Sequence, residues 1–419
     1  MHLHRFVPAL ASVVLPTLLS AQTPVELIGL GDRTPAPVVR IDRATCATRT
    51  CPTLLTGAMP PPIGGTAYDA TIGAVWVSNG PAIQAVDPDS CRIVCPPHVL
   101  PGVGTGVQIT GLAINEFARA LIVADDSNVI RQFDLGCSVT AATARCQLML
   151  PLGSVLTGIA SDDVRDLLIY SVASIGAPVG PANRLFIARR GDPCNPVCSV
   201  PVPVDCDGDR IGAITGVAYD GCRDVVVVTA DQPGAPEPIL LYLRVNPSNC
   251  QPQLVRCCTP ALNFNLVGLA IKPSRATSVG TNCSNLGCPA CPQMRHAVVG
   301  DAVLGNQDFR LDLRDAPANS VASLFLGAGA CSPPGILVRP FCGPLLVPVV
   351  PFLPVVVSAP TGGGAGGGAC SGNVRIRAPI PLDPVFCGGV LSTQFVGVCA
   401  TAVLGTYVSN CQSWEITSS

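Results

Sequence analysis

The stretch Gly216-Val217-Ala218-Tyr219-Asp220 is one of five similar segments, and the recurrence of this segment decides the fold. Every copy begins with Gly and has Ala two residues later. The other four copies occupy residues 65–69, 111–115, 158–162 and 268–272, and successive copies begin 46 to 58 residues apart. A repeat of this length is typical of propellers and solenoids, in which each repeat is one supersecondary unit.

Two more β-rich runs follow the Gly-x-Ala segment, as residues 120–123 and 129–134 show in the second copy. They are rich in apolar and β-branched residues and end at turn-forming residues, so each copy predicts successive antiparallel strands. Residues 38–42 with Cys46 and Cys51 resemble a third and fourth strand without a first and second. The fifth copy, from Leu266 to about Val279, supplies a first and second strand. These two ends predict one composite sheet, and therefore an all-β, five-bladed β-propeller over residues 36–280 after an N-terminal lead over residues 22–35.

The Gly-x-Ala start, the short β run and the Asp-containing turn resemble the repeats of NHL, YVTN and lactonase-type bacterial β-propellers over about residues 36–280. This resemblance implies the fold and transfers no catalytic residue. Lactonase-like propellers place metal-binding acids and histidines around the axis, and this sequence has no matching histidines.

The pattern changes after the repeats. Residues 281–296 form a Cys-rich linker, and residues 297–419 contain short strands separated by Pro and Gly turns, which predicts a β-sandwich. With its Pro-Ile-Pro-Leu-Asp run at 379–383, this segment resembles a C-terminal β-sandwich appended to many secreted bacterial proteins.

The N-terminus has the features of a secretory signal peptide over residues 1–21: Arg5, an apolar run over 7–19, and Ser20-Ala21 at the cleavage point. The apolar run is too short to span a membrane, so we expect no membrane span in the mature chain. All 22 cysteines come after this segment. Such a density indicates an oxidising compartment, so the expected location is extracellular, periplasmic or at the cell surface.

Each repeat carries a cysteine pair that we expect to clip the hairpin between the third and fourth strands. The predicted pairs are Cys46–Cys51, Cys91–Cys95, Cys137–Cys146, Cys194–Cys198, and Cys250 with Cys257 or Cys258. The partners of Cys206, Cys222, Cys258, Cys283, Cys288, Cys291 and the six cysteines after residue 330 stay open, and Cys257 or Cys258 is one alternative for Cys222. Cys288 and Cys291 also have zinc-site spacing, although an exported chain favours disulfides.

Asp205, Asp207 and Asp209 form the one candidate metal site, since alternate aspartates can converge on a calcium ion. The alternative is a solvated acidic turn between blades. Asn79, Asp125, Asp126 and Asp231 follow second strands, and we expect them on the same propeller face as the Asp205 loop, where a ligand would bind. Asp69, Asp162, Asp220 and Asn115 follow first strands. There Asp and Asn are typical turn residues, and an axial acid cluster is the alternative.

Net charge and histidine content exclude several classes of function. The net charge is −2, and removal of residues 1–21 with Arg5 leaves 24 basic and 27 acidic side chains, or −3. Arginines scattered along a near-neutral chain predict no binding to nucleic acid or anionic lipid. After processing only His98 and His296 remain, so a Ser-His-Asp triad is not expected, and no catalytic residue can be named.

We therefore expect a non-enzymatic binding or structural protein that uses a propeller face to bind an extracellular protein, glycan or small molecule. The alternative is a metal-dependent extracellular hydrolase or lactonase-like enzyme. Calcium is the one cofactor that the sequence suggests.

Overall fold

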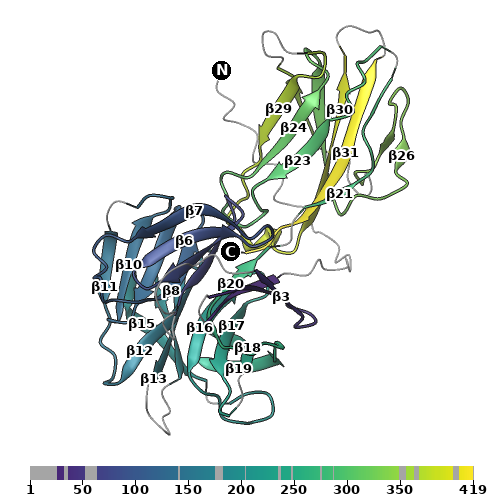
Figure 1. Ribbon diagram of the computed structural model, residues 1–419. Coiled ribbons are helices and arrows are strands. Elements are labelled where there is room, and N and C mark those ends of the chain that lie inside the picture. The colour runs from purple at the N-terminus through teal and green to yellow at the C-terminus, as the bar shows by residue number, and fades with distance from the viewer. Residues whose placement is uncertain are drawn as a thin grey trace.

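The computed structural model describes residues 26–418 apart from 33–35, 52–63, 140–141, 175–182, 203, 235–236, 247–248, 274–275, 286, 349–354, 363–367 and 400–404. The predicted signal peptide lies outside the described residues. The described chain forms antiparallel sheets (Figure 1), and Pro384–Phe386 forms a 3-10 helix. Within these ranges, no helix has the length and apolarity that a membrane crossing requires.

The first two thirds of the chain form five four-stranded antiparallel sheets, which we number I to V. Sheet I contains β20 (Leu266–Lys272), β1 (Glu26–Gly31), β2 (Val38–Asp42) and β3 (Thr48–Cys51). Sheet II contains β4 (Thr66–Asp69), β5 (Ala74–Asn79), β6 (Ala82–Asp87) and β7 (Arg92–Val99). Sheet III contains β8 (Ile109–Asn115), β9 (Ala120–Asp125), β10 (Val129–Asp134) and β11 (Ala142–Gln147). Sheet IV contains β12 (Ser154–Asp162), β13 (Leu167–Ser174), β14 (Arg184–Arg189) and β15 (Asp192–Pro201). Sheet V contains β16 (Ile214–Asp220), β17 (Val225–Asp231), β18 (Pro238–Asn246) and β19 (Gln251–Cys258).

The repeated glycines bring the first strands of the sheets together in a ring. A Cβ built on Gly65 would lie 2.7 Å from the backbone of Gly111, and one on Gly111 would lie 2.7 Å from that of Ile159. The same close approach links Gly158 to Val217, Gly216 to Gly268, and Gly268 back to Gly64 and Thr66. Because the series returns to its start, the five sheets form a closed ring. Each repeat needs Gly at this position, since any side chain would push neighbouring strands apart.

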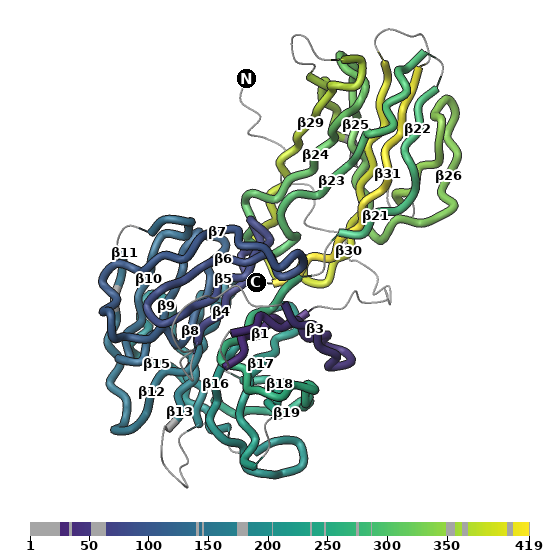
Figure 2. The backbone as a smooth tube through the Cα atoms, viewed as in Figure 1, coloured from purple at the N-terminus to yellow at the C-terminus, as the bar shows by residue number. Residues whose placement is uncertain are grey.

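The composite sheet differs from the prediction in how the two ends of the chain share it. The fifth copy contributes only β20, and the N-terminal part contributes three strands. The additional strand is β1 (Figure 2). Its register against β20 pairs Ile28 with Ala270. The predicted lead over residues 22–35 therefore contains a strand of the ring. The repeat pattern does not predict β1, because this strand has no Gly-x-Ala start.

The predicted hairpin disulfides are wrong, because the cysteines of the ring connect neighbouring sheets. The five bonds between adjacent sheets are Cys51–Cys91, Cys95–Cys137, Cys146–Cys194, Cys198–Cys250 and Cys46–Cys258. We call this set the disulfide belt. In each bond, a cysteine of a fourth strand meets a cysteine at the start of the fourth strand in the next sheet, or in the turn before it. Sequence spacing does not reveal these bonds, because the cysteines of a predicted hairpin disulfide pair with cysteines of neighbouring sheets instead.

The C-terminal region begins earlier than predicted. Its larger sheet runs in the order β21 (Thr277–Val279), β31 (Thr406–Glu415), β30 (Val390–Val398), β25 (Val321–Ala328) and β28 (Val355–Pro360), with β22 (Cys283–Ser284) also paired to β31. A second sheet has the order β23 (Arg295–Val299), β24 (Arg310–Ala316) and β29 (Gly372–Arg377), and β26 (Ile336–Leu337) pairs with β27 (Pro344–Leu345). The predicted linker over residues 281–296 thus contains β22 and the start of β23.

One hydrophobic core joins the two larger sheets of the C-terminal region. Leu311 and Leu313 of β24 pack with Phe395 of β30 and Trp414 of β31, and all four side chains are buried. Val374 of β29 completes the contact. Alternate residues of β24 and β29 therefore face this core, and the residues between them face away.

The C-terminal region contacts one end of the ring, where the first strands end. The Tyr68 hydroxyl donates to Asp301 at 2.6 Å, and the Cys222 amide donates to the Ser418 hydroxyl at 3.2 Å. A disulfide joins Cys222 to Cys387. We call this end the near face. The opposite end, where second strands end and first strands begin, is called the far face.

Candidate functional site

The aspartates that end the first strands form turns on the near face. Asp69 accepts from the Thr71 amide at 3.0 Å, and Asp220 accepts from the Arg223 amide at 3.1 Å. Asp162 and Asn115 accept in the same way from Arg165 and Ala118. This confirms the turn interpretation of these positions. Within the described ranges, no three His, Cys, Asp or Glu side chains are grouped to hold a metal ion.

Arginines neutralise the buried carboxylates of the near face and connect neighbouring sheets. Arg119 of sheet III forms a bidentate contact with Asp69 of sheet II, at 2.9 and 3.1 Å, and also binds Glu116 at 2.8 Å. Burial is the largest influence on Glu116 and raises its pKa, and the charge of Asp69 acts in the same direction. The sequence analysis missed Glu116, which directly follows the repeated turn position. These contacts join sheets II and III at the near face.

The axis of the ring is closed to a substrate. The cavity between the first strands has a volume of about 40 Å³ and is lined mainly by apolar residues such as Leu112, Ile159 and Val217. Small-molecule sites typically occupy roughly 300–1,000 Å³, and one water in the liquid takes roughly 30 Å³. This axis therefore has room for about one water, and an axial active site does not fit.

The four predicted far-face residues differ in how accessible they are. Asn79 and Asp126 are partly exposed, and Asp126 accepts from the Gln108 amide at 3.0 Å. Asp125 is fully buried, where it pairs with Arg131 and accepts from the Val129 amide, so it cannot meet an external ligand. Its side chain stabilises a turn instead.

Asp231 is the titratable group of the far face with the clearest perturbation. Burial, and then the charge of Asp32, raise the pKa of Asp231 to about 6. Its backbone carbonyl accepts from Gly212, which places the loop before β16 beside the end of β17. Asn183 also donates to the Gly212 carbonyl. Loops from sheets IV and V thus meet at this point of the far face.

The candidate calcium residues form a turn in this structure. The Asp205 carboxylate accepts from the amides of Asp207 and Asp209 at 3.0 and 2.9 Å. Asp205 is buried, whereas Asp207 and Asp209 are exposed. A disulfide between Cys206 and Cys257 holds the loop against β19. The three carboxylates are therefore not brought together, and the backbone uses the one that is buried.

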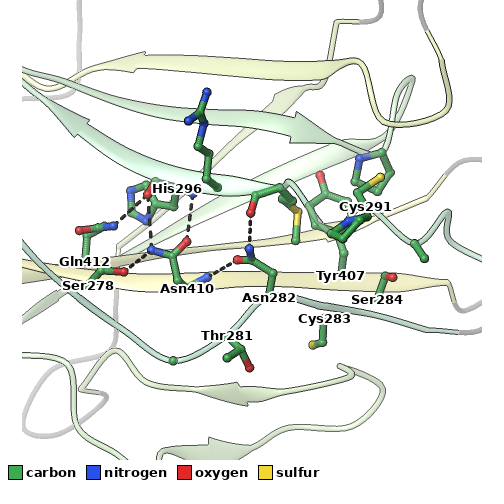
Figure 3. A pocket seen from close by; sticks show the side chains of 16 residues that line it. Ser278, Thr281, Asn282, Cys283, Ser284, Cys291, His296, Tyr407, Asn410 and Gln412 are labelled. Carbon is green, nitrogen blue, oxygen red and sulfur yellow. Dashed lines mark hydrogen bonds between the residues drawn. The ribbon is translucent and has the colours of Figure 1, made fainter.

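A cavity with a volume of about 800 Å³ lies in the C-terminal region (Figure 3). Side-chain amides form its floor. Asn410 accepts from the His296 amide at 3.0 Å, Gln412 donates to the His296 carbonyl at 2.8 Å, and Asn282 accepts from the Asn410 amide at 2.8 Å. These amides take the place of backbone hydrogen bonds between β31 and its neighbours, so their donors and acceptors are largely used within the protein.

His296 lines this cavity and lies in β23, not in a linker as the sequence suggested. Its side chain is buried, contacts Phe395 edge-on at 4.9 Å between ring centres, and meets the Thr393 hydroxyl at 3.3 Å. Burial lowers the pKa of His296 to about 4. The imidazole is therefore neutral at pH 7, and its contacts with Thr393 and Phe395 do not make up a Ser-His-Asp triad.

The remaining cysteines also form disulfides, which leaves no thiolate for zinc. Cys283, Cys288 and Cys291 pair with Cys342, Cys399 and Cys370, and Cys331 pairs with Cys411. With these bonds all 22 cysteines are paired. The disulfide interpretation of the 288–291 spacing is confirmed, and so many bonds indicate an oxidising environment outside the cytosol.

Comparison with known proteins gives matches to solved structures alone: no family model and no curated protein matches the chain. A structure titled as the nidogen/laminin complex is similar with a TM-score of 0.35 and 14% identity, over 60% of this chain and 98% of that one. A structure of U3-55K has a TM-score of 0.35 and 9% identity, over 60% and 86%. The RRP9 WD40 repeats have a TM-score of 0.36 and 8% identity, over 60% and 85%.

Proposed function

We propose that sheets I to V are the five blades of a β-propeller, that the C-terminal region is a β-sandwich, and that the exported protein is a binding module. Its interaction surface is the far face of the propeller. The observation that carries this proposal is the position of the C-terminal region, which contacts the near face through Tyr68–Asp301 and the Cys222–Cys387 disulfide.

Three further features support binding over catalysis. The axial cavity of about 40 Å³ has no room for a substrate. The buried acids of the near face are paired with arginines. On the far face, loops that connect different sheets lie side by side, as the Gly212–Asp231 hydrogen bond shows. Loops presented by a rigid scaffold are the usual location of a binding surface.

Substitution of the far face tests this proposal. The purified, oxidised protein would be used to recover partners from the surface and secreted fractions of the producing cells, with quantitative mass spectrometry as the readout. We expect the variant Asn79→Arg/Asp126→Arg/Asp207→Arg to lose partners that the wild type recovers. Asp134→Arg, an exposed substitution at the end of β10 on the near-face side, is the control. Equal recovery by all three proteins would contradict the proposal.

A further inference from the structure

Five arginines gather on the outward face of the three-stranded sheet β23-β24-β29. The register pairs Arg295 with Arg314, Arg310 with Arg377, and Asp312 with Arg375. Directly opposed residues in antiparallel strands point to the same side of a sheet. Leu311 and Leu313 point into the core, so these charged residues share the opposite, outward side. We call them the arginine face.

The arginine face has an excess of positive charge. Asp312 lies buried at its centre, with Arg314, Arg375 and Arg310 at 2.8, 3.4 and 3.8 Å from its oxygens. The second acid, Asp315, lies 3.8 Å from Arg295. Five arginines and two aspartates leave a formal charge of +3 on this face, in a chain whose total is −2. One buried carboxylate cannot saturate three guanidinium groups, so donors remain for an external anion.

The arginines are accessible to a large ligand. The side chains of Arg295, Arg375 and Arg314 are 65, 62 and 41% exposed, and Arg377 is also exposed. In the described chain, β23 and β29 are the outer strands of this sheet, with one bridge between Asn373 of β29 and Gly362, and none of the exposed large apolar side chains lies on these strands. A face that is charged, flat and without protruding apolar groups cannot insert into a bilayer, since membrane-surface binding also needs buried apolar area.

We propose that the arginine face binds a linear, acidic polysaccharide through its sulfate or carboxylate groups. Guanidinium groups match such planar or tetrahedral oxyanions with paired hydrogen bonds. At roughly 3.4 Å per residue, Arg310 and Arg314 span about 14 Å along β24, and the three strands span about 10 Å across. The array is thus larger than one anion and fits a chain that carries anions at intervals. The disulfides favour a glycan over nucleic acid, because they indicate a compartment outside the cytosol. This proposal is independent of the far face.

Affinity for defined polymers tests the arginine face. Heparin and polygalacturonate supply sulfates and carboxylates, and titration calorimetry at several salt concentrations gives Kd values. The variant Arg295→Gln/Arg375→Gln/Arg377→Gln is expected to bind both polymers at least about tenfold more weakly. Each exposed ion pair between an arginine and an anion contributes up to about 1 kcal/mol. The matched control Arg49→Gln/Arg92→Gln/Arg244→Gln makes the same charge change at exposed positions on the ring and should change Kd less than about twofold.

Each other outcome overturns the proposal. No binding of wild type to either polymer, or an equal loss in both triple variants, would remove the arginine face as a site. Equally tight binding to phosphatidylglycerol vesicles would favour a lipid surface, and equally tight binding to duplex DNA would indicate unspecific attraction between charges. Since the substituted side chains are exposed, unchanged circular dichroism and Tm are expected in both variants and establish that loss of binding is not loss of fold.

Discussion

Cys46 and Cys258 are 212 residues apart in the sequence, and a disulfide joins them with 6.1 Å between their Cα atoms. This bond closes the disulfide belt, since it connects the fourth strand of sheet V to the turn before β3 of sheet I. The ring is therefore closed twice: by the pairing of β1 with β20 near the axis, and by a covalent bond at the periphery.

Disulfide mapping should recover the five bonds between adjacent sheets. After digestion without reduction, we expect linked peptides that contain Cys51 with Cys91, Cys95 with Cys137, and Cys46 with Cys258. Mass spectrometry with fragmentation makes this measurement. Linked peptides that pair Cys91 with Cys95, or Cys194 with Cys198, would instead favour hairpin clips and contradict the belt.

Removal of the closing disulfide should destabilise the ring. The double variant Cys46→Ala/Cys258→Ala is expected to lose about 2–4 kcal/mol in free energy of unfolding, because its unfolded chain gains conformational freedom. Guanidinium titration of the oxidised protein measures the change. The double variant Cys206→Ala/Cys257→Ala, which frees an exposed loop, is the matched control and should lose less. A larger loss in the control would mean that the closing bond adds little.

Arg119 should be essential for the stability of the near face. In Arg119→Ala, the buried Asp69 loses its bidentate contact with a cation, and we expect the free energy of unfolding to fall by about 3 kcal/mol at pH 7. Arg119→Lys should recover only part of it, since an ammonium cannot reproduce the bidentate contact. Arg92→Ala, at an exposed position on β7, is the control and should stay within about 0.5 kcal/mol.

The lowered pKa of His296 predicts that acid destabilises the C-terminal region. Its pKa is about 4 in the folded protein and 6.5 in a model peptide, so the unfolded state binds the proton more tightly. The stability that the neutral imidazole contributes is present above pH 6.5 and is lost as the pH falls toward 4, by about 3 kcal/mol in total. Thermal unfolding from pH 7 to pH 4 should therefore show a steeper decline for wild type than for His296→Gln. His98→Gln is the matched substitution, and identical slopes for wild type and His296→Gln would contradict the assignment.

Calcium should leave the melting temperature unchanged. The Asp205 carboxylate already accepts two backbone amides, and Asp207 and Asp209 are exposed. Differential scanning calorimetry in millimolar calcium and in chelator is the direct comparison. A rise of several degrees with calcium, abolished by Asp205→Asn, would restore the metal site that the aspartate spacing suggested.

The repeat itself determined much of the architecture. Gly at positions 65, 111, 158, 216 and 268 marks where first strands touch, and the apolar runs after each Gly mark strands, because both signals arise from contacts that every repeat makes in the same way. Asp69 and Asp220 could be interpreted as turn residues for the same reason, since an aspartate that bonds its own backbone needs no distant partner.

Tertiary structure alone decided which groups from distant parts of the chain meet. Cysteine spacing suggested disulfides within each hairpin. Cys91 instead bonds to Cys51 of the neighbouring sheet, which is 40 residues away in the sequence. Arg295 and Arg375 are 80 residues apart and share one sheet face only because β23 and β29 both pair with β24. Strand propensity and the repeat are encoded within a few residues of sequence. How the sheets close into a ring and pack decides the disulfide partners, the covered face of the ring and the arginine face.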